Sequence, residues 1–145
     1  MIKDIFKDVL RHTHALGFIE QVKISGDAES TTIEAMDADK TVILQGKLHN
    51  PVADFVDQTV GLSRMSVLDG YLKFPGFTDE GSDVSVQTQS RNGEDIPVEI
   101  SFTSAEGHSG SYRFMLADVI NQQLKSVTMK EIPWDVTIVP SQKNL

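Results

Sequence analysis

The sequence predicts an α+β fold of two α-β-β-β half-repeats, with two helices on one face of an antiparallel sheet. Two helix-like segments, residues 2–16 and 63–74, are each followed by three segments of strand-like composition. Turn-forming clusters of Gly, Asn and Asp separate the strand candidates, which favours antiparallel hairpins over crossover connections. The two halves share this order of elements but no fixed-period sequence identity.

The first half opens with a helix. Residues 2–16 carry apolar side chains at three- and four-residue steps, the spacing of one helix face. Gly17 follows where a C-cap glycine ends a helix. Three strands rich in Ile, Val and Thr are predicted next, and a fourth links this half to the second: residues 18–25, 31–36, 41–48 and 57–62.

The second half repeats the pattern. Ser63 is a favourable N-cap for a helix over residues 63–74, and Pro75 with Gly76 ends it. Three further strands follow, with an Asn92-Gly93 turn between the first two. They are predicted at residues 83–90, 97–103 and 110–117.

One domain is predicted over residues 1–118, followed by a connector at 119–133 without clear periodicity. Residues 134–139 alternate in side-chain direction and predict one more strand. Ser141 then provides a helix-start signal. Residues 134–145 are therefore expected to be either the start of a second, truncated domain or a polar tail.

The composition narrows the classes of protein and site. The 145-residue chain has 21 Asp and Glu, 13 Lys and Arg, no cysteine and a formal net charge of −8. Without cysteine, disulfide scaffolds, cysteine-ligated zinc, iron–sulfur clusters and thiol nucleophiles are excluded. The acidic balance argues against basic charge over the whole surface, but it allows a protein that gathers its bases on one face.

No targeting or membrane segment is predicted. Charged residues interrupt residues 1–18, so the apolar core of a signal peptide is missing there. The longest apolar runs are far shorter than the roughly 20 residues that a membrane span needs. We therefore expect a soluble cytoplasmic protein without a membrane partner, with a host cell or nucleus left open.

Basic residues gather on the two predicted helices. Lys3, Lys7 and Arg11 recur at four-residue steps and form a stripe beside the apolar face of the first helix. Arg64 and Lys73 lie on the second helix, whereas most acidic residues fall in strands and turns. This pattern is compatible with a nucleic-acid surface, and equally with a solvated helix face of mixed charge.

Five segments, taken in order, resemble the first domain of ring-shaped DNA sliding clamps of the proliferating-cell-nuclear-antigen type. They are residues 6–10 (FKDVL), 33–44 (IEAMDADKTVIL), 62–68 (LSRMSVL), 112–118 (YRFMLAD) and 132–141 (IPWDVTIVPS). The last segment is similar to the exit from the family's interdomain connector into a second domain. Clamps of this type carry at least two domains per chain, so the resemblance implies a truncated chain or a ring assembled in another way.

The resemblance implies a non-enzymatic polymerase processivity factor that encircles duplex DNA only as a homo-oligomer. Helices line the hole of such a ring and present Lys and Arg to phosphates, while the outer sheets are acidic. These contacts are independent of base sequence and loose enough to permit sliding. The DNA-binding residues implied here are Lys3, Lys7, Arg11, Arg64 and Lys73.

A second implied function is the docking of replication proteins, such as a polymerase or a clamp loader. In the family, a short peptide with hydrophobic anchors binds a groove beneath the interdomain connector. The implied partner-binding residues are Met36, Leu124, Val127, Met129, Ile132 and Pro133. Alternatively these side chains pin the connector onto the sheet, an interpretation that suits Val127 and Ile132 better than Met36 and Met129.

The sequence contains no recognisable catalytic motif. His12 and His14 are two apart on a helix and point in different directions, so they do not form a chelating pair. We therefore predict no enzyme activity, metal or cofactor. Two alternatives stay open: a small α+β interaction module, such as a viral structural or assembly protein without a DNA role, and an enzyme whose site forms across subunits.

Overall fold

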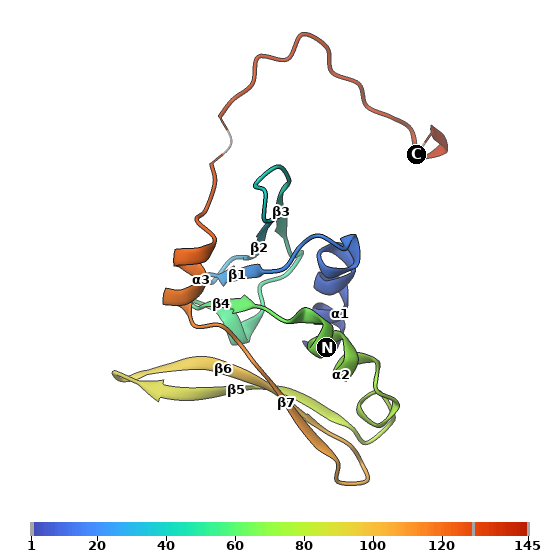
Figure 1. The fold of residues 1–145 in the computed structure, drawn as a ribbon, viewed down its shortest axis with the longest axis vertical. Coiled ribbons are helices and arrows are strands. Elements are labelled where there is room, and N and C mark those ends of the chain that lie inside the picture. The colour runs from blue at the N-terminus through green and yellow to red at the C-terminus, as the bar shows by residue number, and fades with distance from the viewer. Residues whose placement is uncertain (1, 129, 145) are drawn as a thin grey trace.

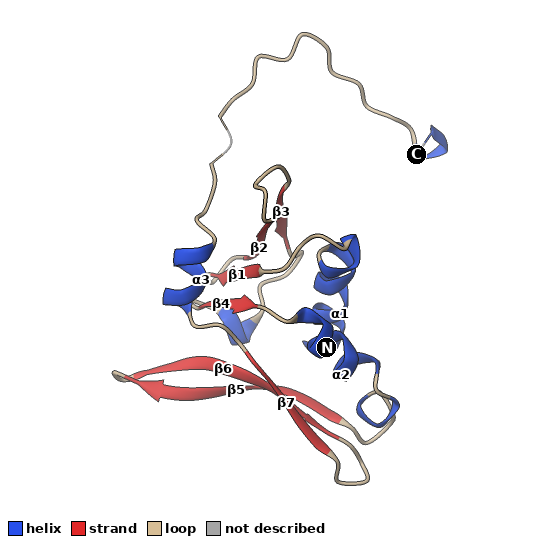
Figure 2. Cartoon of the chain, in the orientation of Figure 1, coloured by secondary structure: helices blue, strands red, loops and turns tan. Residues whose placement is uncertain are grey.

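A computed structural model describes residues 2–128 and 130–144 and gives an α+β fold (Figures 1 and 2). Within these residues, three α-helices accompany two antiparallel sheets. The helices are α1 (Ile2–His12), α2 (Met65–Lys73) and α3 (Ala117–Gln123). The strands are β1 (Val22–Gly26), β2 (Thr31–Met36), β3 (Ile43–Lys47), β4 (Thr59–Leu62), β5 (Asp83–Arg91), β6 (Glu94–Thr103) and β7 (Ser109–Arg113).

The strands form two sheets, whereas the sequence predicted one. Sheet A has the order β3-β2-β1-β4, and sheet B has the order β5-β6-β7. A single bridge joins them, in which Gly61 and Met115 exchange two backbone hydrogen bonds of 2.9 and 2.8 Å. Helix α3 begins two residues after Met115, and Ile120 of this helix packs against Gly61 of β4.

The predicted connector contains helix α3, which spans the predicted domain end at residue 118. The prediction of an aperiodic connector was therefore wrong at its start. The helix has only seven residues and buries one of them, Ile120, against β4. Such a short helix leaves little periodicity in the sequence, although Leu116, Ile120 and Leu124 do recur at four-residue steps.

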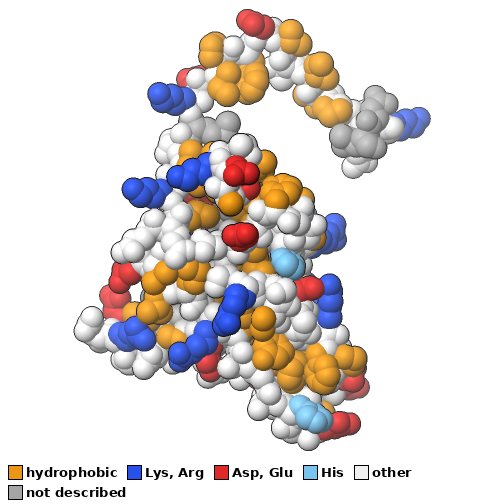
Figure 3. Space-filling model, in the orientation of Figure 1, with side chains coloured by type: hydrophobic (Ala, Val, Ile, Leu, Met, Phe, Trp, Pro, Cys, Tyr) orange, Lys and Arg blue, Asp and Glu red, His pale blue; other side chains and the backbone are white. Residues whose placement is uncertain are grey.

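The strand predicted at residues 134–139 is absent from the structure, where this segment is extended and exposed. Its alternation is real, but no strand among the described residues pairs with it, and a strand needs a partner for its backbone groups. Figure 3 shows hydrophobic side chains along this segment, away from the body of the molecule. The predicted helix start at Ser141 corresponds to a short 3₁₀ turn, Gln142–Asn144.

The predicted N-cap of the second helix was also wrong. Ser63 is not the cap, because both of its backbone polar groups bond to the side-chain hydroxyl of Tyr112. Arg64 occupies the cap position in a left-handed conformation, with φ 46° and ψ 49°. Helix α1 ends at His12, four residues before its predicted end, so Gly17 caps the 3₁₀ turn His14–Leu16 in place of α1, in a left-handed conformation with φ 87°.

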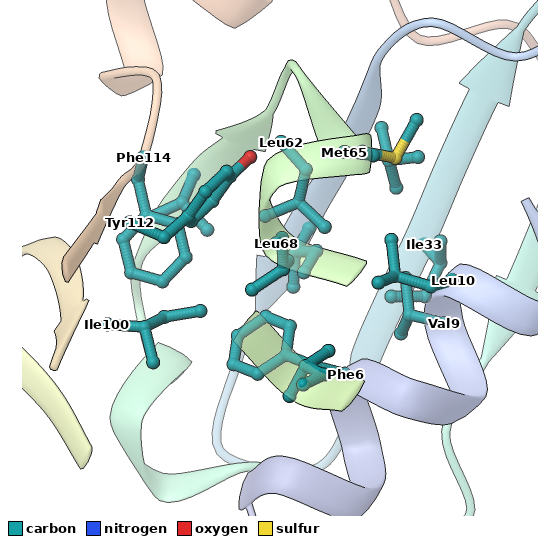
Figure 4. Close-up of a cluster of buried hydrophobic side chains, with 14 of the residues drawn as sticks. Phe6, Val9, Leu10, Ile33, Leu62, Met65, Leu68, Ile100, Tyr112 and Phe114 are labelled. Atoms are coloured by element: carbon teal, nitrogen blue, oxygen red, sulfur yellow. The ribbon is translucent and has the colours of Figure 1, made fainter. Parts of the chain in front are cut away.

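The core lies where both sheets and helices α1 and α2 meet (Figure 4). Phe6 of α1 packs against Phe55 and Phe114, with each pair of ring centroids 6.0–6.1 Å apart. Leu68 of α2 and Ile100 of β6 are fully buried in the same cluster. Because one core serves both halves, the two halves fold as one unit.

Helices α1 and α2 pack against each other (Figure 1). The Oγ1 atom of Thr13, just after α1, is 4.0 Å from the Sδ atom of Met65, the first residue of α2. Residues of both helices, among them Lys7 and Lys73, line one groove. This packing brings charged side chains of the two helices together on one surface.

Candidate nucleic-acid interface

A groove between α1 and α2 gathers three of the five predicted DNA-binding residues: Lys7, Arg11 and Lys73. The groove has a volume of about 610 Å³. Its lining consists of Lys7, Leu10, Arg11, His14, Ala15, Asp69, Leu72 and Lys73. On the side where Figure 1 places α1, Figure 3 shows Lys or Arg side chains next to a carboxylate and a His.

The local fold explains why these bases face outward. Phe6, Val9 and Leu10 bury the apolar side of α1, so residues one turn apart on its other side, Lys7 and Arg11, are exposed. On α2 the burial of Leu72 leaves the next residue, Lys73, exposed in the last turn. The outward position of each basic residue therefore follows from ordinary helix amphipathicity. The packing of α1 against α2 then brings these residues close together.

The groove carries an excess of positive charge. Lys73 Nζ forms an ion pair of 2.6 Å with the Asp69 carboxylate, one helical turn earlier. Among the ion pairs of the described residues, none involves Lys7 or Arg11. Three cations thus face a single carboxylate, and two of them are free to meet an anion from outside.

The other two predicted bases do not line this groove. Lys3 is half-buried in the first turn of α1. Arg64 is exposed at the opposite end of α2 from Lys73, near the end of α1 where Thr13 meets Met65. The five bases therefore divide into a cluster of three and two separate positions.

Three predicted partner-binding residues also come together, at the end of β2. Met36 and Leu124 line one hollow of about 160 Å³, and Met36 and Val127 line a second of about 430 Å³. Lys40 lines both. We call this double hollow the connector groove. Ile132 and Pro133 are exposed and line neither hollow, and Met129 lies outside the described residues.

Hydrogen bonds that the sequence did not reveal fix the connector across sheet A. Lys23 Nζ, on a largely buried side chain, donates to Ser126 Oγ at 2.8 Å, and Ser126 donates to Glu34 at 3.2 Å. Gln45 donates to the Val127 carbonyl at 2.6 Å. These partners are more than 80 residues apart in the chain, so no local pattern predicts them.

A hydrogen-bonded turn forms one wall of the connector groove. The Asp37 carboxylate accepts bonds from the Val42 N–H and the Thr41 N–H, both 2.7 Å long, and from the Thr41 hydroxyl at 2.8 Å. The Val42 N–H first, and then the Thr41 hydroxyl, hold the pKa of Asp37 below its usual range. The ionised carboxylate thus organises the turn that follows Met36.

A turn after β6 brings a serine, a histidine and a glutamate together. Ser104 Oγ is 3.3 Å from His108 Nδ1, and Glu106 is 3.9 Å from the same nitrogen. A catalytic relay needs the serine and the acid on different ring nitrogens. Ser104 Oγ also accepts the His108 backbone N–H at 2.9 Å, so the group closes a turn.

The described residues contain no group of three or more His, Asp or Glu side chains placed to hold a metal ion. No helix among them is long and apolar enough to cross a membrane. Comparisons of the chain with known proteins found no matching family model and no matching curated protein.

Proposed function

We propose that the chain is a non-enzymatic subunit of a DNA sliding clamp that serves as a polymerase processivity factor, with α1 and α2 facing duplex DNA. The observation that carries the proposal is the convergence of Lys7, Arg11 and Lys73 on one groove between two helices. The clamp-like half-repeat and a cytoplasmic location belong to the same proposal.

The geometry suits contact with phosphates. Lys7 and Arg11 are four residues apart on α1, a rise of about 6 Å and close to two nucleotide steps of about 3.4 Å each. Their long side chains bring charge to a backbone without reading base edges. A single subunit covers only a short stretch of duplex, so effective encirclement requires several copies in a ring.

The connector groove supports a second element of the proposal, the docking of replication proteins. Met36 supplies a flexible apolar side chain, and the Asp37 turn and the bonded connector hold its surroundings in place. A preformed groove lowers the entropic cost of binding an extended peptide. We propose that it takes peptides with hydrophobic anchors from a polymerase or a clamp loader.

Charge reversal in the α1–α2 groove tests DNA binding. Anisotropy of a labelled duplex of about 20 base pairs is titrated with the full chain at about 20 mM and about 150 mM salt. The variant K7E/R11E should weaken binding at low salt at least about tenfold. The slope of log affinity against log salt concentration (the salt slope) should fall by the amount expected for the loss of about two phosphate contacts. Sedimentation of the same samples reports the oligomeric state.

A matched control keeps the change in net charge but moves it away from the groove. R91E/K143E alters the tip of the β5–β6 hairpin and the 3₁₀ turn Gln142–Asn144, and both residues are exposed. This variant should bind duplex nearly as well as the wild-type chain. Equal losses in the two variants, or no binding by an assembled oligomer at low salt, would contradict the proposed DNA contact.

A second candidate is an interaction or assembly module without a DNA role. It is favoured by the extended segment after the connector, where Trp134, Val136 and Ile138 are 70–80% exposed. Exposed apolar side chains in a row are typical of surfaces that bind another protein. This candidate predicts no salt-dependent binding to duplex DNA, so the same titration separates the two functions.

A further inference from the structure

Tyr112 of β7 ties sheet B to the joint between β4 and α2. Its hydroxyl accepts a bond from the Ser63 N–H at 3.0 Å and donates one to the Ser63 carbonyl at 2.5 Å. The tyrosine is only 4% exposed, and its ring packs edge-on against Phe114. One buried hydroxyl therefore fixes both backbone polar groups of the residue before Arg64.

This bond pattern decides how α2 begins. Ser63 has a side chain suited to capping, and if it capped the helix, Arg64 would be the first helical residue. Instead, Arg64 adopts the left-handed conformation, and its carbonyl accepts the Val67 N–H at 3.0 Å. A left-handed arginine is unfavourable by itself, so the neighbouring structure must hold it.

The Arg64 side chain is exposed, and its charge acts on the Tyr112 hydroxyl, which bonds to the backbone of the preceding residue, Ser63. Burial raises the pKa of Tyr112 to about 12, and the Ser63 N–H bond and the nearby Arg64 charge act in the opposite direction. The hydroxyl thus keeps its proton at physiological pH and can donate to Ser63 continuously. A change of Arg64 to a helical conformation would redirect its side chain relative to α1 and the groove.

We propose that Tyr112 is a positioning residue that directs Arg64 toward a phosphate of the bound duplex, beyond the reach of the Lys7, Arg11 and Lys73 cluster. The inference rests on the proposed function. It adds a fourth cation to the DNA contact and explains why a buried tyrosine of the opposite sheet bonds to the start of α2.

A double-mutant cycle on the full chain tests it, with a labelled duplex as the probe. Arg64→Gly removes the guanidinium and keeps a left-handed cap, because glycine adopts that conformation freely. Tyr112→Phe removes only the hydroxyl. Each variant should weaken binding at low salt about three- to tenfold. Each should also lower the salt slope by the amount expected for the loss of about one phosphate contact. The double variant should bind no more weakly than Arg64→Gly alone.

Tyr71→Phe is the matched control, since Tyr71 is a partly buried tyrosine on α2 with no hydrogen bond to Ser63. It should leave the affinity and the salt slope unchanged. Thermal melting verifies that every sample is folded at the titration temperature. The salt slope is the decisive readout, because a mere loss of stability does not change the number of phosphates contacted.

The outcomes separate this inference from the proposed function. Additive losses in the double variant, or an unchanged slope in Tyr112→Phe, would overturn the positioning role. If Arg64→Gly has no effect while K7E/R11E abolishes binding, the inference fails and the DNA-binding function stands. If the wild-type oligomer binds no duplex, both fail.

Discussion

Helices α1 and α2 border the same groove, yet different forces hold them in place. Phe6 anchors α1 in an aromatic cluster with Phe55 and Phe114, a contact that depends on how closely the rings fill the core. Helix α2 also buries apolar side chains, but its start is fixed by the directional bonds between Tyr112 and Ser63. The position of α1 is thus a matter of packing, and that of Arg64 a matter of hydrogen-bond geometry.

Truncation of Phe6 should give the largest effect on stability. Phe6→Ala removes a fully buried ring from the cluster that joins α1 to both sheets, and we expect a loss of about 3–5 kcal/mol in the free energy of unfolding. Urea denaturation measures it. Ile5→Ala, at a partly buried position of the same helix, should cost clearly less. Equal costs would mean that the aromatic cluster does not anchor α1.

High pH should weaken the attachment of α2 specifically. The Tyr112 pKa is about 12 in the folded protein and near 10 in an unfolded chain, so folding favours the protonated hydroxyl. Its stabilisation is fully present below pH 10 and is lost as the pH rises toward 12, by about 2–3 kcal/mol in total.

Urea denaturation between pH 9 and 12 measures this loss, within the range set by the folded pKa of about 12. Tyr112→Phe should lack this part of the decline, whereas Tyr71→Phe should keep it. A Tyr112→Phe chain that loses stability with pH as steeply as the wild type would show that the hydroxyl does not hold the joint.

The bridge between the sheets is the third point of attachment. A Cβ atom at Gly61 would lie 2.8 Å from the Cβ atoms of both Met115 and Ile120, closer than packed side chains allow. Gly61→Ala should therefore destabilise the fold by about 1–3 kcal/mol. Gly46→Ala is the matched control in sheet A, because its Cβ would meet Ile33 at an ordinary 3.8 Å. Similar melting temperatures for the two variants would contradict this account.

Local sequence patterns predicted the elements whose causes are local. The apolar stripe of α1, the strand Thr31–Met36 and the Asn92-Gly93 turn follow from side-chain spacing and turn chemistry. The start of α2 was mispredicted because its cause, Tyr112, lies 49 residues away in the sequence. The bridge between the two sheets likewise joins residues far apart in the chain, Gly61 and Met115.

The candidate sites follow the same rule. The sequence placed Lys7 and Arg11 on one helix face, but only the packing of α2 against α1 adds Lys73 and Asp69. For the connector groove, the family resemblance supplied Met36, Leu124 and Val127. It did not supply Lys23, Glu34 or Gln45, which hold the connector through contacts between distant segments.

The smallest effect concerns the Asp37 turn, where the support is again directional but the carboxylate is only partly buried. The pKa of Asp37 is lowered by bonds to Val42 and Thr41, so its stabilisation is present above the ordinary carboxyl pKa. It is lost as the pH falls through the lower folded value. Asp37→Asn should therefore melt slightly below the wild type at neutral pH, and the gap should close in acid.

Thermal melting between neutral pH and about pH 3 measures this gap, since an ordinary Asp titrates near 3.9. Asp39→Asn makes the same charge change in the same turn without removing those bonds, so it should show no such closing gap. A constant gap for Asp37→Asn would mean that an amide at this position cannot support the turn for steric reasons, and that charge is not the cause. The turn that forms the wall of the connector groove would then depend on steric fit, as the position of α1 does. Attachment by directional hydrogen bonds would in that case be limited to Tyr112.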